Sequence, residues 1–302
     1  MAKHEAHAPH GSADARALLV ALAVLGAFVV VEVTAALLAH SLALLADAGH
    51  LFVDLGALGV SLWALRLAAR PTTTDLTFGL KRAEILAAAS NGVTLLLISL
   101  VVTYGAINRL LHPRHVVGGV VIVVAIAGVA ANLLAARVLA NSSKSSLNVE
   151  GSYRHVVTDL YAFLATLVAG VVIVTTHFER ADALASLFVV VLMLRAAYAL
   201  LRASGTILLE ATPANVNLDE VRSHVLEVAH VRSVHDLHAW TVTSGLPALT
   251  AHVVVDDDCF RDGCGPRILD ELQRCLGGHF DIEHSTFQME PSSHLDHEPG
   301  SH

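Results

Sequence analysis

Apolar residues dominate the first two thirds of the chain and are grouped into six long blocks. These blocks cover residues 16–39, 41–68, 83–111, 116–140, 148–177 and 182–204. Each block is long enough for the ~20 residues that an α-helix needs to cross a bilayer. The connection at residues 40–41 is so short that the first two helices should form a hairpin. The pattern therefore predicts an all-α membrane bundle of six helices.

The pattern changes after residue 205, where apolar positions recur at helical or alternating spacing. Amphipathic helices are expected at 217–229 and 266–276, with strands at 235–242, 248–255 and 282–289. The order αββαβ is most simply satisfied by a three-stranded sheet covered on one face by two helices.

Four parts of the chain follow from these patterns. We expect a disordered, His-bearing tail at 1–15, a membrane domain at 16–205, a soluble domain at 206–291 and a disordered tail at 292–302.

Composition supports the membrane assignment and excludes some partners. The chain is 54% hydrophobic and only 15% charged, whereas a soluble domain has roughly 25% charged residues. No basic run accompanies the formal net charge of −8, which argues against a nucleic-acid partner. The odd number of cysteines and the lack of a CxxC pattern predict a reducing compartment without a disulfide framework.

Basic residues indicate the orientation of the bundle. They are concentrated in the connections at 66–82 and 141–147, which places these connections in the cytoplasm. With six spans, both termini would then be cytoplasmic. The abundance of Ala, Val and Leu favours a multi-pass protein surrounded by the lipid of a bacterial inner (plasma) membrane.

Two pairs of ionisable residues interrupt the apolar blocks. His50 and Asp54 are four residues apart, and the same spacing returns in His155 and Asp159, so each pair occupies one face of its helix. An ionisable group at bilayer depth costs about 2.5–3.5 kcal/mol or more. Two imidazoles and two carboxylates form a tetrahedral set that zinc accepts. The alternative is that each His only hydrogen-bonds its own Asp and stitches the bundle together.

Further polar residues lie inside the same blocks. Asp47 shares the face of His50 and Asp54, and could hold the His50 ring, receive the ion on entry or act as an alternative ligand. We favour the first two roles. Glu32 could line the ion path or only hydrogen-bond between helices.

Several longer motifs carry a family resemblance. They are Ser41-Leu-Ala-Leu-Leu-Ala-Asp-Ala-Gly-His50 with Asp54, Thr77-Phe-Gly-Leu-Lys-Arg-Ala-Glu-Ile-Leu86, His155 with Asp159, Val234-His-Asp-Leu-His-Ala-Trp240, Leu249-Thr-Ala-His252 and His284-Ser-Thr-Phe-Gln-Met-Glu290. With these motifs the chain resembles the cation diffusion facilitator family, in its zinc-exporting bacterial branch, over about residues 17–290. The resemblance implies six membrane helices, a ferredoxin-like (α+β) cytoplasmic domain that binds metal, a homodimer, and export of divalent metal against protons.

The resemblance also implies site residues. The transport site would comprise His50, Asp54, His155 and Asp159. The cytoplasmic site would comprise the residues His235, His252 and His284, with Glu290 near the same cluster. Where some relatives have a further histidine, near the loop after the second strand, this chain offers Cys259 and Cys264, of which we assign Cys264. His235 and His252 lie on the two strands of a hairpin and His284 begins the next strand, so we expect the three to converge. His238 should point to the opposite face as a surface residue.

These residues lead to a functional hypothesis. We expect a secondary active transporter, not an enzyme, that exports Zn²⁺ in exchange for protons by alternating access, with Cd²⁺ or Co²⁺ as other candidate cargo. Zn²⁺ would also be a regulatory ligand of the soluble domain. The alternatives are a membrane-bound zinc sensor, a membrane metalloenzyme and a passive channel. A closed set of four ligands disfavours the enzyme because it leaves no open zinc position.

Overall fold

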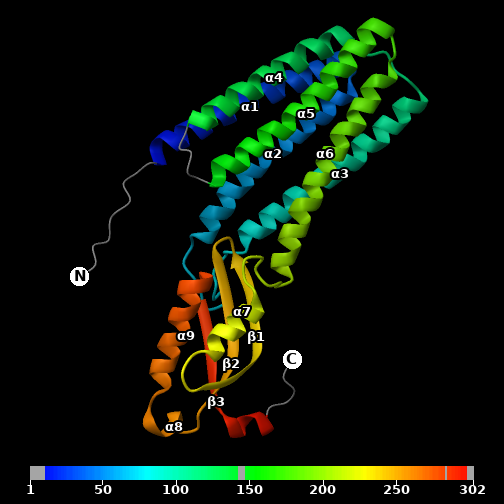
Figure 1. Ribbon diagram of the computed structural model, residues 1–302. Helices are drawn as coiled ribbons and strands as arrows, with labels where there is room; N and C mark the ends of the chain where they lie inside the picture. The colour runs from blue at the N-terminus through cyan, green and yellow to red at the C-terminus, as the bar shows by residue number, and fades with distance from the viewer. Residues whose placement is uncertain (1–10, 142–146, 283, 298–302) are drawn as a thin grey trace. The chain divides into compact units, whose positions relative to one another are not determined.

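Helices account for the first two thirds of the computed structural model, which describes residues 11–141, 147–282 and 284–297 (Figure 1). Within these ranges each predicted apolar block is helical. The long helices are α1 (Gly11–Ala39), α2 (Leu42–Ala68), α3 (Ala83–Leu111), α4 (Gly118–Asn141), α5 (Leu147–Thr176) and α6 (Arg180–Leu208). Helix α1 begins before residue 16, because Ala13 and Ala15 are strong helix formers that extend it.

Two compact units make up the chain. One contains the described residues up to Val60 together with Ser90–Leu201, and the other contains Ser61–Ala89 and the chain from Arg202 onward. The first unit therefore holds the body of the helical bundle. The second holds the connected ends of α2 and α3, the end of α6 and the C-terminal domain.

The helices of the first unit present apolar surfaces. Among the described residues, α3, Asp159–Thr176 of α5 and α6 are long and apolar enough to cross a membrane, and Gly26–Ala39 and Gly118–Leu134 are shorter apolar stretches. Large apolar side chains such as Val101 and Tyr104 are 72% and 77% exposed. Such side chains suit contact with lipid tails. The number of six spans stays a prediction.

Two clusters of buried apolar side chains hold the bundle together. One, which includes Phe28 and Phe163, joins α1, α2, α4 and α5 to the start of α6. The other, which includes Leu95 and Met193, joins α2, α3, α5 and α6. A Cβ atom at Gly128 of α4 would lie 2.2 Å from a ring carbon of Phe163, so the missing side chain permits the close approach of α4 and α5.

An acidic side chain of α6 caps the start of α2. The carboxylate of Asp182 is buried and accepts hydrogen bonds from Ser41 Oγ at 2.5 Å and the Leu42 amide at 2.7 Å. Arg109 Nη1, at the end of α3, donates to Asp182 at 3.1 Å and to the His40 carbonyl at 2.6 Å. A carboxylate at a helix N-terminus satisfies amides that lack an intrahelical partner. This contact joins α2, α3 and α6 at one end of the bundle.

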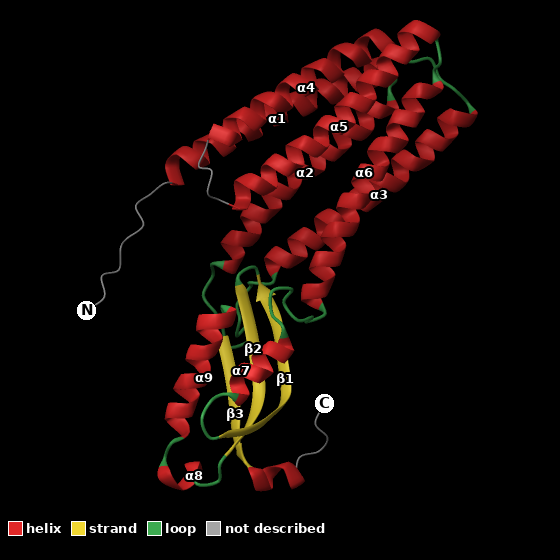
Figure 2. Ribbon diagram, viewed as in Figure 1, coloured by secondary structure: helices red, strands yellow, loops and turns green. Residues whose placement is uncertain are grey.

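The C-terminal domain follows the predicted order of helices and strands, with two short additions (Figure 2). Its described elements are α7 (Leu218–Leu226), β1 (Val231–Thr243), β2 (Leu246–Val255), α8 (Cys259–Asp262), α9 (Gly265–Phe280), β3 (His284–Pro291) and the 3₁₀ helix η1 (Ser292–His297). Helix η1 lies where the sequence predicted a disordered tail. Both the amide and the hydroxyl of Ser292 donate to Asp257, which fixes its start.

A mixed sheet forms the centre of this domain. Strands β1 and β2 are antiparallel, β3 is parallel to β2, and the order is β1-β2-β3. Alternate residues of β2 are buried with the apolar sides of α7 and α9, so both helices cover the same face. These strand residues are Leu249, Ala251, Val253 and Val255.

A disulfide joins Cys259 and Cys264 across α8, contrary to the prediction from cysteine number and spacing. The chain reverses at Gly263, which has a φ of 71°, and the two Cα atoms are 5.0 Å apart. That separation lies within the range for a disulfide. Because its sulfur is bonded, Cys264 is not a metal ligand in this structure. Cys275 has a free thiol.

Candidate metal centres

The first candidate site lies inside the helical bundle, where His50 of α2 stands between two carboxylates. Nδ1 of its ring is 3.5 Å from Oδ2 of Asp54, one turn further along α2. Nε2 is 3.5 Å from Oδ1 of Asp159 on α5. One ligand atom from each residue lies within 4.8 Å of the others, close enough to hold a single ion. The contact between His50 and Asp159 links two helices. The alternative, in which each histidine only hydrogen-bonds the aspartate of its own helix, does not account for this contact.

Protein largely surrounds this site. The exposed fractions of the side chains are 7% for His50, 21% for Asp54 and 4% for Asp159. Buried carboxylates need a cationic or hydrogen-bonding partner, and a divalent ion supplies the charge that offsets both. His155 lies one turn before Asp159 on α5, but its side chain is outside the described residues, so its role as a fourth ligand stays a prediction.

Two further acids lie near this site. Glu32 of α1 and Asp47 of α2 are fully buried, and their carboxyl groups interact electrostatically with each other and with Asp159. Asp47 is therefore close enough to influence the site. Its assignment as a residue that holds His50 or receives the ion stays a prediction.

The register of the sheet creates the second candidate site. His235 of β1 pairs directly with His252 of β2, so both side chains point to the same face. Glu290 of β3 pairs with the residue two positions after His252, which places it on that face as well. The residues on either side of His252 are buried against α7 and α9. The site therefore lies on the face of the sheet opposite the helices.

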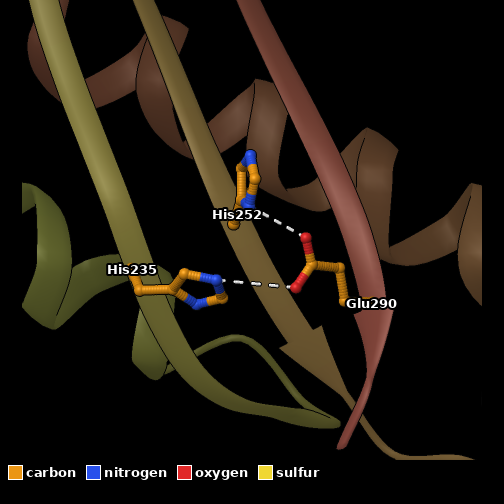
Figure 3. Close-up of side chains that lie close together, drawn as sticks. All are labelled: His235, His252 and Glu290. Carbon is orange, nitrogen blue, oxygen red and sulfur yellow. Dashed lines mark ion pairs between the residues drawn. The ribbon is translucent and has the colours of Figure 1, made fainter. Parts of the chain in front are cut away.

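The carboxylate of Glu290 reaches both imidazole rings (Figure 3). Its Oε1 is 2.9 Å from His252 Nδ1, and its Oε2 is 3.5 Å from His235 Nε2. The two ring centroids are 5.1 Å apart, with planes inclined at 73°. Glu290 is 2% exposed. Two imidazole nitrogens and a carboxylate oxygen are a usual donor set for Zn²⁺, so these residues fit a bound metal ion.

A β-bulge changes the predicted direction of His238. Residue 235 pairs with residue 252 and residue 238 with residue 250, so β1 has one extra residue between these pairs. The extra residue turns His238 to the same face as His252, not to the opposite one. Asp236, in this bulge, has a φ of 47°. Its carboxylate is 2.9 Å from His238 Nε2 and 3.7 Å from His252 Nε2.

Sequence reasoning missed the position of Asp236. The signal available was the acid directly after His235 in a His-Asp-Leu-His run. Strict alternation along a strand would point the Asp236 side chain away from the site, so the sequence pattern did not predict its position.

The structure does not bring His284 to this cluster. In the parallel register His284 pairs with Ala248, four residues before His252 on β2. At about 3.3 Å per strand residue this is a displacement of roughly 13 Å. The ring of His284 instead lies edge-on to Phe78, with centroids 5.6 Å apart. The expected convergence of three histidines was wrong for the chain described here, because the third strand is parallel to the second.

Two family models match nearly the whole chain. Residues 18–209 match the cation efflux transmembrane domain, and residues 213–292 match the cytoplasmic domain of cation efflux proteins. These matches cover both candidate metal centres.

Curated relatives are similar over almost their full lengths. A "Cadmium, cobalt and zinc/H(+)-K(+) antiporter" of Bacillus velezensis is 37% identical over 95% of this chain and 92% of the relative. The "Metal cation efflux system protein CzcD" of Cupriavidus metallidurans is 37% identical over 93% and 88%. The "Zinc transporter ZitB" of Escherichia coli is 37% identical over 98% and 95%.

A solved structure of the metal-bound C-terminal domain of the Cupriavidus metallidurans CzcD transporter is also similar. It is 43% identical, covers 25% of this chain and 99% of the solved chain, and has a TM-score of 0.22. The family models, the relatives and the apolar helices together identify the chain as a multi-pass membrane protein of the cation efflux (cation diffusion facilitator) family, whose members are cation transporters and not enzymes.

Proposed function

We propose that the chain is a proton-coupled antiporter that exports Zn²⁺ from the cytoplasm by alternating access, with Cd²⁺ and Co²⁺ as further cargo. The observation that carries the proposal is the position of His50, whose two nitrogens face carboxylates on two different helices. A ring placed in this way can bind a proton or a metal ion, but not both at the same nitrogen.

The exchange follows from the charges. When His50 is protonated, the imidazolium can donate from both nitrogens to Asp54 and Asp159, so each carboxylate keeps a cationic hydrogen-bond partner when no metal is bound. A metal ligand must be a neutral imidazole, so binding of Zn²⁺ releases the proton. Nitrogen ligands favour Zn²⁺, Cd²⁺ or Co²⁺ over Mg²⁺ or Mn²⁺. Rocking of helices would then expose the site to either side of the membrane.

We assign six spans to the bundle, with both termini in the cytoplasm of a bacterial cell and the protein in its inner membrane. The C-terminal domain is ferredoxin-like and joins two copies into a homodimer. The His235, His252 and Glu290 cluster would bind cytosolic Zn²⁺ and tighten that dimer. Support comes from the match to a cytoplasmic domain of cation efflux proteins and from the donor set.

Proton flux in reconstituted vesicles tests the transport proposal. Full-length protein is incorporated into vesicles that contain a pH-sensitive dye, and Zn²⁺ is added under an imposed pH gradient. Asp54→Asn and Asp159→Asn should reduce Zn²⁺-driven proton movement to the level of protein-free vesicles. Asp258→Asn is the matched control, because its side chain is 72% exposed and it belongs to neither group of candidate ligands. Wild-type rates in both carboxylate variants would remove the transport assignment.

A separate measurement tests the cytoplasmic site. Glu290→Gln keeps the shape of the side chain and removes its charge. The full-length variant should bind one Zn²⁺ fewer per chain and lose Zn²⁺-dependent dimer stabilisation in analytical ultracentrifugation. Unchanged stoichiometry together with unchanged dimerisation would remove the regulatory role.

A further inference from the structure

A third group of metal-binding side chains lies on the helical face of the C-terminal domain. His224 is on α7, and Cys275 and His279 are one turn apart on α9. The rings of His224 and His279 have centroids 5.1 Å apart, with planes inclined at 49°. The thiol of Cys275 is 3.7 Å from Nδ1 of His279. Neither the transport site nor the Glu290 cluster uses these residues.

Two of the pairwise separations are close to those expected between ligands of a tetrahedral metal. If Zn²⁺ binds one nitrogen of each ring at about 2.1 Å and a thiolate at about 2.3 Å, the centroids are about 5.2 Å apart and sulfur and nitrogen about 3.6 Å apart. The observed values are 5.1 and 3.7 Å. The His235 and His252 rings of the second candidate site also have centroids 5.1 Å apart. The three residues are not among the groups whose ligand atoms all lie within 4.8 Å of one another, so a rotation of at least one ring has to complete the site around an ion.

A hydrogen bond to the backbone orients the His224 ring for metal binding. Nδ1 of His224 is 2.9 Å from the carbonyl oxygen of Glu220, one turn earlier on α7. A carbonyl only accepts, so Nδ1 carries the hydrogen and Nε2 has the free lone pair. Metal-binding histidines usually have one nitrogen fixed by such a hydrogen bond.

The local charge also favours a cation. The carboxylates of Glu227 and Glu271 are close enough to the Cys275 thiol to interact with it electrostatically. The same carboxylates attract a divalent ion, which deprotonates a coordinating thiol. Glu227 lies three residues after His224 and is exposed, so its carboxylate or a water molecule can complete four ligands.

We propose that Cys275, His279 and His224 form a separate site for a thiophilic divalent cation such as Zn²⁺, Cd²⁺ or Co²⁺. This site is distinct from the Glu290 cluster, because α7 and α9 cover the opposite face of the sheet. A thiolate and two imidazoles select these ions over Mg²⁺ and Mn²⁺. A bound ion would tie α7 to α9. The inference does not depend on transport by the helical bundle.

Cobalt absorption tests the site in the full-length chain. The chain has three cysteines, so the Cys259→Ser/Cys264→Ser double variant retains only the Cys275 thiol. In this background Co²⁺ should produce a sulfur-to-cobalt charge-transfer band in the near ultraviolet, with one site per chain. His224→Ala and His279→Ala should each weaken Co²⁺ binding at this band at least tenfold. His238→Ala is the matched control, because His238 is an exposed histidine of the same domain and should leave the band unchanged.

Two further readouts separate metal binding from loss of fold. Stoichiometric Zn²⁺ should slow alkylation of Cys275 by N-ethylmaleimide at least tenfold, and His279→Ala should abolish this protection while eluting normally in size-exclusion chromatography. Cys275→His should keep Zn²⁺ binding but lose the charge-transfer band. Absence of the band in the background variant, or an unchanged band in both histidine variants, would overturn the proposal.

Discussion

Replacing Asp182 by Asn should lower the unfolding temperature of the full-length chain by about 5 °C, because an unfolding entropy of about 2.1 cal/mol/K per residue gives roughly 1.6 °C per kcal/mol for 302 residues. The change preserves the shape of a side chain that is 1% exposed and removes its charge. Three groups donate strong hydrogen bonds to this carboxylate: Ser41 Oγ, the Leu42 amide and Arg109 Nη1, at 2.5, 2.7 and 3.1 Å.

The magnitude follows from these donors. A hydrogen bond to a charged group contributes about 1.5–3 kcal/mol and a neutral one about 1 kcal/mol, so loss of the charge costs about 1 kcal/mol for each donor. Three donors give about 3 kcal/mol in total. The side-chain amide of the new asparagine also brings two N–H groups into a position where every neighbouring group donates. The loss of about 3 kcal/mol in stability is therefore a lower bound.

Two other substitutions make the reasoning testable. Ser41→Ala removes one donor to Asp182 and the acceptor of the Leu44 amide, so it should cost about 1–2 kcal/mol, less than the loss of the charge. Asp258→Asn breaks an exposed pair with Arg261 and should change stability by less than about 1 kcal/mol. The assay is thermal unfolding in detergent followed by size-exclusion chromatography. Equal midpoints for Asp182→Asn and Asp258→Asn would refute the capping role.

Two further predictions concern other parts of the chain. Gly128→Ala should destabilise the bundle by about 1–3 kcal/mol, because the new Cβ would lie 2.2 Å from the ring of Phe163, whereas Gly119→Ala on the same helix meets nothing within 4 Å and should be neutral in the same thermal assay. Glu227→Gln should lower the pKa of Cys275 and, in metal-free buffer at neutral pH, speed its alkylation by up to about fivefold. An alkylation rate at or below that of the wild type would contradict the electrostatic influence of Glu227.

Helical periodicity predicted most of the helices of the bundle and, at the membrane site, the position of His50 and Asp54 on one face of the same helix. The spacing of His50 and Asp54 places both on one face of α2 whatever the rest of the protein does. Their meeting with Asp159 could not be read from spacing alone, since it depends on how α2 packs against α5. The capping of α2 by Asp182 has no local signal either, because the two partners are separated by more than 130 residues.

In the C-terminal domain, alternation predicted the strands but not their register. The bulge at Asp236 turned His238 to the metal-bearing face, and the parallel pairing of β3 placed His284 about four residues from His252 while bringing Glu290 to it. A shift of one residue reverses the face of every following side chain. Composition and hydrophobic spacing are local properties, so the sequence by itself determined the helices, the strands and the kinds of ligand. Only the tertiary structure decided which ligands meet, because register and helix packing are fixed by contacts between distant segments.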